Sequence, residues 1–192
     1  DKELARAIIG IPPDKLYILF FAGTGAWKRK NFEILARAFS KAPDLPVHAI
    51  VVGGVADSEL MRDPRFSFFK SFDPVLDAAK IVALYNAVDA FCITSLIDNL
   101  PNTVLEAISC ARPVIGARVG GVMDGVNGWL FDPRDTDSAV SALQRFSESA
   151  PIFDEMGQMS LKIAREKFQQ SDVAGAFRAL YEELAEIHHK RN

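Results

Sequence analysis

Short apolar runs and longer amphipathic stretches alternate along the chain. Each apolar run is three to seven residues long and rich in β-branched or aromatic residues, which is typical of buried strands. These runs cover residues 17–22, 47–53, 66–69, 90–94, 114–117 and 129–131. Because a helical pattern separates most of them, the sequence predicts an α/β fold, a single Rossmann-like doubly wound parallel sheet with helices on both faces.

The amphipathic stretches repeat their apolar residues at spacings of three and four, which predicts helices. The expected helices lie within residues 1–15, 32–39, 76–88, 101–111, 136–149, 152–168 and 171–188. Thr136 is expected to cap its helix. The last helix carries an apolar stripe formed by Val173, Phe177, Leu180, Leu184 and Ile187. We expect this stripe to pack against the core rather than against a membrane.

Residues 90–117 form the stretch around which the prediction is organised. They are predicted to form a strand, a polar loop at 95–99, a helix and a second strand that starts at Val114. Pro101 suits the first turn of the helix, where a backbone N–H is not needed. The loop therefore lies at the carboxyl end of a strand and the amino end of a helix, where parallel sheets bind ligands.

Two carboxylates mark this stretch. Asp98 precedes the predicted helix, and Glu106 lies about two turns inside it, four positions after Asn102. Spacing alone is compatible with an ordinary arrangement, in which Asp98 caps the helix and Glu106 is solvated. The choice between that arrangement and a binding site depends on the surrounding residues.

Composition limits the class of protein. The chain has 192 residues, 49% of them hydrophobic, and a net charge of −3, which is typical of one globular domain and excludes a broadly basic nucleic-acid surface. No apolar run approaches the roughly 20 residues of a membrane span. The chain opens on Asp1, without a signal peptide or an initiator Met, which suggests a fragment of a longer protein.

Cysteine and histidine usage argues against metal and disulfide chemistry. Cys92 falls in an apolar strand and Cys110 on a helix, so both are expected to be reduced thiols of a cytoplasmic protein. His48, His188 and His189 are scattered or terminal, which does not favour a metal centre or a histidine-based triad.

The residues of the central stretch resemble a known signature. The run DNLPNTVLEA at 98–107, followed by SCARPVI at 109–115, is similar to the donor-site E-x(7)-E motif of the family 4 retaining glycosyltransferases. The likeness continues through Val-Gly-Gly at 119–121 and Gly-Val-Asn-Gly at 125–128 and covers nearly all of the chain. Asp98 replaces the usual first Glu, as in a variant of the motif. The resemblance implies the C-terminal, donor-binding half of a glycosyltransferase B fold, with domain limits 1–192 and no N-terminal acceptor domain.

The same resemblance implies roles for individual residues. Asp98 would hydrogen-bond the donor sugar, Glu106 would hold the ribose diol, and Lys30 would face the diphosphate. Residues of the helix start and its loop would add polar or backbone contacts: Ser95, Asn99, Leu100, Pro101, Asn102 and Thr103. The resemblance also implies that charge on the leaving diphosphate would be met by Lys30 and free N–H groups, without a metal or other cofactor.

Two further loops are expected to contact the donor. The loop after the first strand contains Gly23, Thr24, Lys28 and Arg29, and small residues with positive charge at a helix start suit a phosphate. Thr24 stands where the family has an Arg, and Lys28 or Arg29 would compensate. In the loop after the third strand, Lys70, Ser71 and Phe72 are candidates for contacting the nucleotide base, with a packing role for Phe72 left open.

The resemblance implies a transferase that moves a sugar from UDP or GDP to a saccharide or lipid-linked acceptor, in polysaccharide or glycolipid assembly. It would act in the cytoplasm or at the inner face of the membrane, and the isolated domain would bind donor without transferring it. Two alternatives remain. One is an inactive docking module, which Thr24 and the short segment 121–125 favour. The other is a sugar-nucleotide epimerase of similar fold, for which the chain places no catalytic His.

Overall fold

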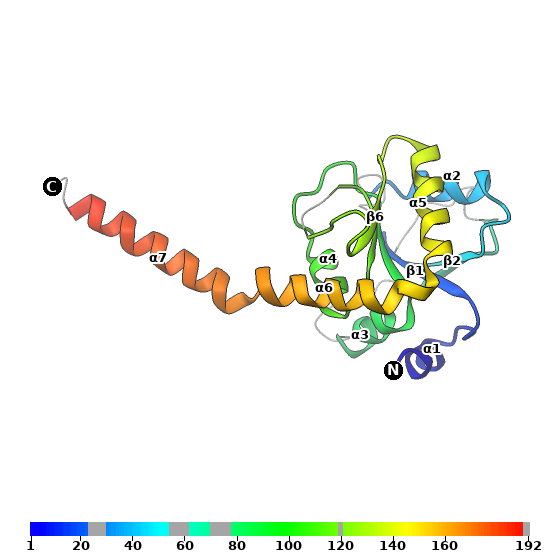
Figure 1. Cartoon of the computed structure of the whole chain (residues 1–192), viewed down its shortest axis with the longest axis horizontal. Coiled ribbons are helices and arrows are strands. Elements are labelled where there is room, and N and C mark those ends of the chain that lie inside the picture. Colours follow the sequence, from blue (N-terminus) through cyan, green and yellow to red (C-terminus); the bar gives the residue numbers. More distant parts are fainter. Residues whose placement is uncertain (23–29, 54–61, 70–77, 119–120, 190–192) are drawn as a thin grey trace.

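A six-stranded, wholly parallel sheet forms the centre of the molecule (Figure 1). The computed structural model describes residues 1–22, 30–53, 62–69, 78–118 and 121–189. The strands are β1 (Leu16–Phe21), β2 (Val47–Val52), β3 (Phe66–Phe69), β4 (Ala90–Ile93), β5 (Val114–Gly116) and β6 (Gly128–Leu130). Their order across the sheet is β3-β2-β1-β4-β5-β6. The expected fold class is confirmed, and the strands begin and end within a residue of their predicted limits.

The helices follow the predicted alternation with the strands. They are α1 (Lys2–Ile9), α2 (Phe32–Lys41), α3 (Ala78–Ala87), α4 (Asn102–Ser109), α5 (Thr136–Glu148), the 3-10 helix η2 (Ala150–Ile152), α6 (Phe153–Lys167) and α7 (Gln170–His189). At α5 and α4 the capping residue differs from the expectation. Asp135, not Thr136, caps α5, since its side chain accepts from the N–H of Asp137. Pro101 is the N-cap of α4 rather than part of its first turn.

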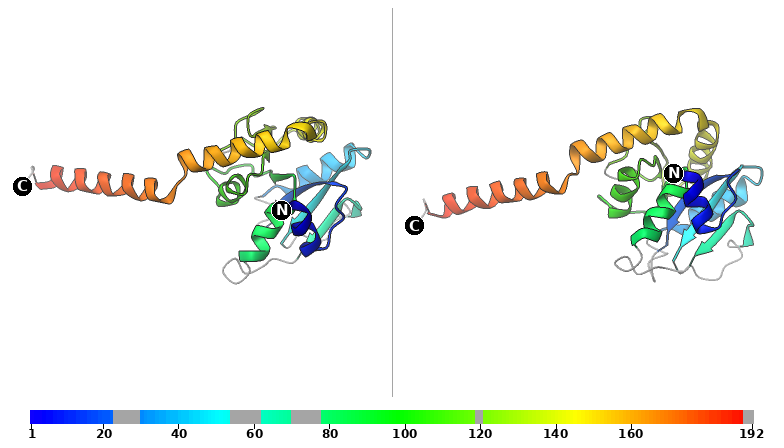
Figure 2. Two further views of the ribbon diagram at one scale, coloured as in Figure 1. Left: turned by 60° about the horizontal axis from the view of Figure 1, so that its bottom comes forward. Right: turned by 90° about the horizontal axis from the view of Figure 1, so that it is seen from below.

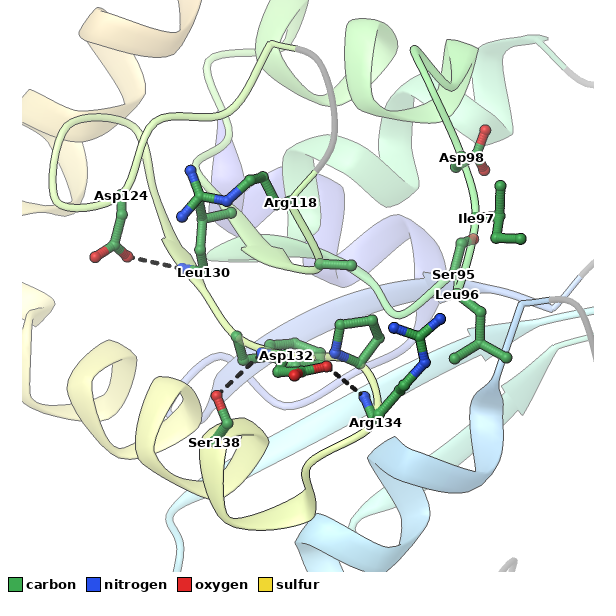
Figure 3. A pocket seen from close by; sticks show the side chains of 13 residues that line it. Ser95, Leu96, Ile97, Asp98, Arg118, Asp124, Leu130, Asp132, Arg134 and Ser138 are labelled. Carbon is green, nitrogen blue, oxygen red and sulfur yellow. Dashed lines mark hydrogen bonds between the residues drawn. The ribbon is translucent and has the colours of Figure 1, made fainter.

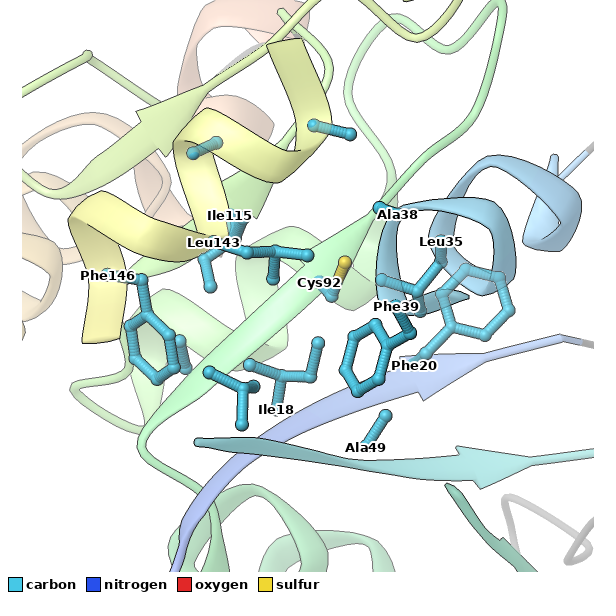
Figure 4. Packing of buried hydrophobic residues seen from close by; sticks show 14 of the residues in the cluster. Ile18, Phe20, Leu35, Ala38, Phe39, Ala49, Cys92, Ile115, Leu143 and Phe146 are labelled. Atoms are coloured by element: carbon cyan, nitrogen blue, oxygen red, sulfur yellow. The ribbon is translucent and has the colours of Figure 1, made fainter. Parts of the chain in front are cut away.

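Helices cover both faces of the sheet because successive side chains of each strand point to opposite sides. On one face, Ile18 and Phe20 of β1 pack with side chains of α2 and α5 (Figure 4). On the other face, Tyr17 and Leu19 pack with side chains of α3, α4 and α6. Burial on two sides explains why β1 is apolar almost throughout.

Helix α7 departs from the expectation. It extends away from the sheet and its covering helices (Figures 1 and 2). Phe177, Leu180 and Leu184, three members of the predicted stripe, are 56%, 47% and 52% exposed. The prediction that the stripe packs on the core is therefore wrong for these three residues. Periodicity identified an amphipathic helix, but it carries no information about what covers the apolar side.

The strand order creates a switch point between β1 and β4. The chain builds outward from β1 through β2 to β3, then returns and builds in the other direction from β4 to β6. The connections after β1 and β4 therefore separate at their carboxyl ends, where open α/β sheets leave a crevice for ligands. The first βα loop and the loop that contains Asp98 both start at this edge.

None of the helices in the part of the chain that the structure describes is both long and apolar enough to cross a membrane.

Candidate active site

Lys30 and Asp98 meet at the switch point. Lys30 lies just before α2 and Asp98 just before α4, and they are 68 positions apart in the sequence. The Nζ atom of Lys30 donates to Oδ2 of Asp98 at 3.1 Å, and each side chain is only 17% exposed. The fold therefore brings together two of the three residues that the sequence proposed as central. Asp98 uses its carboxylate here, and no side chain caps α4.

Two polar residues that sequence reasoning did not assign hold this loop in place. Asn31, the N-cap of α2, has a left-handed backbone with φ of 52°, which Asn tolerates better than most residues. Its side-chain amide donates to the carbonyl oxygens of Thr94 at 3.3 Å and Pro133 at 2.8 Å. The hydroxyl of Thr94 in turn donates to the carbonyl oxygen of Lys30. These bonds join the backbone beside Lys30 to the ends of β4 and β6.

Glu106 is positioned by a buried tyrosine. The Tyr85 hydroxyl, on α3, donates to Oε2 of Glu106 at 2.7 Å and also lies 3.1 Å from the carbonyl oxygen of Thr103. Tyr85 is 1% exposed. Burial, and then the hydrogen bond to Glu106, raise the pKa of Tyr85 far above its usual range, so this hydroxyl keeps its proton. Glu106 itself is exposed and keeps a second carboxylate oxygen for another donor.

The amino end of α4 offers backbone donors at this edge. The carbonyl oxygen of Pro101 accepts from the N–H groups of Val104 and Leu105. The N–H groups of Asn102 and Thr103, in the first turn, precede these and have no partner within the helix. With the helix dipole they favour a negatively charged group. Because Pro101 lacks an N–H, it contributes none.

A cavity of about 640 Å³ opens beside Asp98 at the carboxyl ends of β4, β5 and β6 (Figure 3). Ser95, Arg118 and Arg134 are among its lining residues. Ser95 is 1% exposed, and its hydroxyl has no hydrogen-bond partner among the described residues. The volume is within the range of small-molecule sites. The sequence did not suggest Arg118 or Arg134, because neither belongs to the motif.

The remaining residues proposed from the sequence fall into two groups, those that the structure describes and those that lie outside the described residues. Asn99, Leu100 and Asn102 are exposed at the start of α4, Thr103 is half-buried and Pro101 is buried. Other proposed residues lie outside the described residues: Gly23, Thr24, Lys28, Arg29, Lys70, Ser71 and Phe72. Their roles stay predictions. Within the described part of the chain, no three His, Cys, Asp or Glu side chains gather as a metal site would need.

The family is established by comparison with known proteins. The family described as glycosyl transferases group 1 matches residues 16–149, which include all six strands and the loops at the switch point. This chain belongs to that family, so the resemblance found in the sequence and the assignment to the glycosyltransferases are confirmed.

Its curated relatives are considerably longer. The D-inositol 3-phosphate glycosyltransferase of Rhodococcus erythropolis is 28% identical over 159 residues, which cover 75% of this chain and 36% of that protein. A protein of the same name from Mycobacterium sp. (strain KMS) is 31% identical over 164 residues, covering 79% of this chain and 36% of the relative. The chain thus spans just over a third of the length of the curated relatives it matches.

Solved structures share the fold. A sucrose-phosphate synthase of Thermosynechococcus elongatus superposes with a TM-score of 0.77 at 23% identity, over 95% of this chain and 49% of that one. Anabaena HepE, solved in complex with UDP and glucose, has a TM-score of 0.73 at 22% identity, over 95% of this chain and 51% of that one. The C-terminal domain of a glycosyl transferase group 1 family protein (LpcC) from Francisella tularensis is matched over 88% of this chain and 94% of that chain, with a TM-score of 0.71 at 20% identity.

Proposed function

We propose that this chain is the donor-binding part of a retaining glycosyltransferase, which transfers a sugar from a UDP- or GDP-sugar to a saccharide or lipid-linked acceptor. The observation that carries the proposal is the meeting of Lys30 and Asp98 at 3.1 Å, at the switch point of the sheet. Ligands of open α/β sheets bind at this place. The other proposed residues are arranged around it on α4 and its preceding loop.

The proposed chemistry is electrostatic and needs no metal ion. As the sugar leaves, negative charge builds on the diphosphate, and Lys30 and the N–H groups at the start of α4 would stabilise that charge. Asp98 would accept hydrogen bonds from the donor sugar, and Glu106 would accept both hydroxyls of the ribose. Retention of the anomeric configuration is taken from the family.

In the free protein, Lys30 and Asp98 neutralise each other. A donor can replace this pair with two favourable contacts, its phosphate to the ammonium and its sugar hydroxyls to the carboxylate. A nucleotide without the sugar would separate the pair and satisfy only Lys30. The ion pair therefore favours binding of the whole nucleotide-sugar over the nucleotide alone.

The comparisons support this proposal at a coarser level. The relatives named D-inositol 3-phosphate glycosyltransferases support a glycosyl transfer, and the complex of HepE with UDP and glucose supports UDP as the first nucleotide to test. We propose that acceptor binding and turnover need further chain, because the curated relatives are almost three times the length matched here. We keep saccharide or glycolipid assembly in the cytoplasm or at the inner membrane face as the proposed context.

A titration followed by NMR tests the proposal. UDP, GDP, UDP-glucose and GDP-mannose are added to the 192-residue chain, with and without EDTA. Shifts at Lys30, Asp98 and Glu106 that are insensitive to EDTA are expected for the correct donor. Glu106→Ala should weaken binding by about 1–3 kcal/mol, because the ribose hydroxyls lose their acceptor. Glu155→Ala, which removes an exposed Glu on α6, is the matched control.

If none of these nucleotides perturbs the three residues, the donor site is not here and the inactive docking module becomes the better account. The epimerase alternative gains no support from the structure. Its catalytic His would have to lie at the ligand edge, whereas His48 pairs with Tyr17 near the amino ends of β2 and β1.

A further inference from the structure

The peptide group between Lys30 and Asn31 is tied to two distant parts of the chain. The hydroxyl of Thr94 donates to the carbonyl oxygen of Lys30. The side-chain amide of Asn31 donates to the carbonyl oxygens of Thr94 at 3.3 Å and Pro133 at 2.8 Å, which lie 63 and 102 positions away in the sequence. These bonds fix the backbone beside α2 relative to β4 and β6, to which it does not belong.

The conformation of Asn31 shows that its side chain is used for these ties and not for capping. An N-cap residue usually has an extended backbone, and its side chain accepts from the first turn of its helix. Asn31 instead has φ of 52° and ψ of 46°, and its side chain accepts no bond from the described first turn of α2. A left-handed backbone costs free energy in a residue with a Cβ atom, and such a conformation persists only where surrounding contacts hold it. The two amide bonds are such contacts.

Both acceptors of the Asn31 amide belong to firmly held backbone. Thr94 is 0% exposed and directly follows β4. In the loop after β6, the carboxylate of Asp132 accepts from the N–H of Arg134 at 2.9 Å, which closes a turn with Pro133 at its centre. The ring of Pro133 also fixes its own φ. The amide of Asn31 is therefore bonded to supports that restrict the backbone of residue 31.

The place of this backbone determines what the Lys30 ammonium can reach. A lysine side chain is a flexible four-carbon stem, so its charged end occupies one place only when both the backbone and the ammonium are held. The ammonium donates to Asp98 at 3.1 Å. Because Thr94 precedes Asp98 by four positions, a bond from Thr94 to the Lys30 carbonyl sets the separation of the two main chains that carry these charges.

From these contacts we propose that Asn31 and Thr94 are positioning residues of the donor site. They hold the Lys30 ammonium against Asp98 in the free protein and keep it at the place of the diphosphate when a donor binds. The proposal rests on the proposed function for the role of Lys30. Each residue acts through Lys30, and a nucleotide that meets a cation already in place loses less of its binding free energy to ordering the side chain.

Three variants of the 192-residue chain test the proposal. Asn31→Gly accepts the same left-handed backbone and removes both amide bonds. Thr94→Val keeps the branched shape of this buried residue and removes the hydroxyl, whereas Thr94→Ser keeps the hydroxyl and removes a methyl group. Two quantities are measured. One is the heteronuclear NMR signal of the Lys30 ammonium without ligand, which is sharp when an ion pair slows proton exchange with water, and the other is the Kd for UDP by calorimetry.

Asn31→Gly should weaken UDP binding about tenfold and Thr94→Val about fivefold, the losses expected for one or two hydrogen bonds that hold a binding group in place. The Lys30 ammonium signal should broaden in both variants. Thr94→Ser should match the wild type in both measurements, because the hydroxyl is retained. If Thr94 acted only through packing, the two Thr94 variants would rank in the reverse order, since valine preserves the buried volume and serine does not.

The control is Asn86→Ala, which also removes a side-chain amide bond to a carbonyl oxygen, that of Val82 at 2.9 Å, near the end of α3 that leads into β4. It should change neither measurement. The proposal is overturned if either the ammonium signal or the UDP affinity of Asn31→Gly equals that of the wild type, or if Thr94→Ser is as weak as Thr94→Val. Failure of UDP to bind the wild type contradicts the proposed function instead, and the ammonium signal alone then decides whether Asn31 and Thr94 position Lys30.

Discussion

At the residue scale, the contact between Tyr85 and Glu106 is the clearest positioning contact of the site. The ring of Tyr85 packs with Phe21 and Phe91, and its hydroxyl donates to Glu106 at 2.7 Å. Tyr85→Phe keeps the ring and removes the bond. We expect a loss of about 1 kcal/mol in nucleotide binding, or about fivefold in affinity, because Glu106 is no longer held for its proposed contact with the ribose. Isothermal titration calorimetry with UDP measures it.

The control for this variant is Tyr181→Phe, which removes a hydroxyl from a 67% exposed tyrosine on α7. It should bind UDP as the wild type does. An affinity of Tyr85→Phe that equals the wild type would show that Glu106 does not depend on Tyr85 for its position, or that Glu106 does not contact the ribose.

The ion pair of Lys30 and Asp98 predicts that one substitution will change the affinities for UDP and for UDP-glucose differently. Asp98→Asn releases Lys30 from its partner, so UDP should bind more tightly, by about 1 kcal/mol at low salt and less as salt is added. The same change weakens the proposed acceptor for the sugar hydroxyls, so the advantage of UDP-glucose over UDP should fall. Calorimetric titration of both ligands, in two salt concentrations, measures the difference.

Asp137→Asn is a matched control, since Asp137 pairs with Lys41 on a surface away from the switch point. It also removes one carboxylate and releases one lysine, and it should change neither affinity. If both variants bound UDP more tightly, the cause would be the change in net charge and not the release of Lys30. Unchanged UDP binding in Asp98→Asn would mean that Lys30 does not face the phosphates.

The sequence suggested Lys30, Asp98 and Glu106 as site residues, but not the residues that position them. Asp98 and Glu106 lie in a motif whose spacing is readable along the chain, and Lys30 comes just before a predicted helix in the first βα loop. Tyr85 and Thr94 gained their roles only when the fold placed them beside residues 21 and 64 positions away. No local pattern distinguishes such a tyrosine or threonine from one that simply packs in the core.

At the scale of elements, β4 and β5 approach each other closely at Gly116. A Cβ atom at this position would lie 2.0 Å from the carbonyl oxygen of Ile93, which is backbone and cannot move alone. Gly116→Ala should therefore force the two strands apart and lower the free energy of unfolding by about 1–3 kcal/mol. Urea denaturation followed by circular dichroism measures the change.

The matching control is Gly175→Ala on α7, where a Cβ meets nothing within 4 Å. A helix favours Ala over Gly by about 1 kcal/mol, so this variant should be neutral or slightly more stable. Equal stability of Gly116→Ala and the wild type would contradict the close approach of β4 and β5. Because these strands precede the loops of Asp98 and Arg118, a weakened pair should also reduce ligand binding.

The limits of an element could be predicted where both of its faces are buried. Strands that are covered on both faces are apolar throughout, so their limits could be read from composition alone. Helix starts were less certain, because several residues near a start can act as the cap. Asp135 precedes Thr136, both are good caps, and the structure uses the aspartate.

At the scale of the whole molecule, the alternation of elements determined the topology. Right-handed crossovers and helices on both faces leave few arrangements for six parallel strands, and the switch point between β1 and β4 follows from the order in which they are added. The cavity with Arg118 and Arg134 was not predictable in this way. It depends on how three loops that begin on different strands come together, which no periodicity encodes.

The position of α7 gives a final prediction, about how little this helix contributes to the stability of the domain. This helix extends away from the sheet (Figure 2). Its apolar side chains Phe177, Leu180 and Tyr181 are exposed. Deleting residues 170–192 should therefore leave the free energy of unfolding nearly unchanged, within about 1 kcal/mol, because little apolar surface is removed from a buried position. Thermal unfolding followed by circular dichroism measures it.

A longer deletion provides the contrast. Removing residues 153–192 also takes away α6, whose Met156, Ile163 and Ala164 are buried in the two core clusters. A buried Met or Ile side chain contributes about 1.5–3 kcal/mol and Ala164 less, so the loss of all three should unfold a domain of ordinary stability. If the shorter deletion were as damaging as the longer one, α7 would have to pack against the sheet in solution. If both deletions were harmless, the core would have to close without α6.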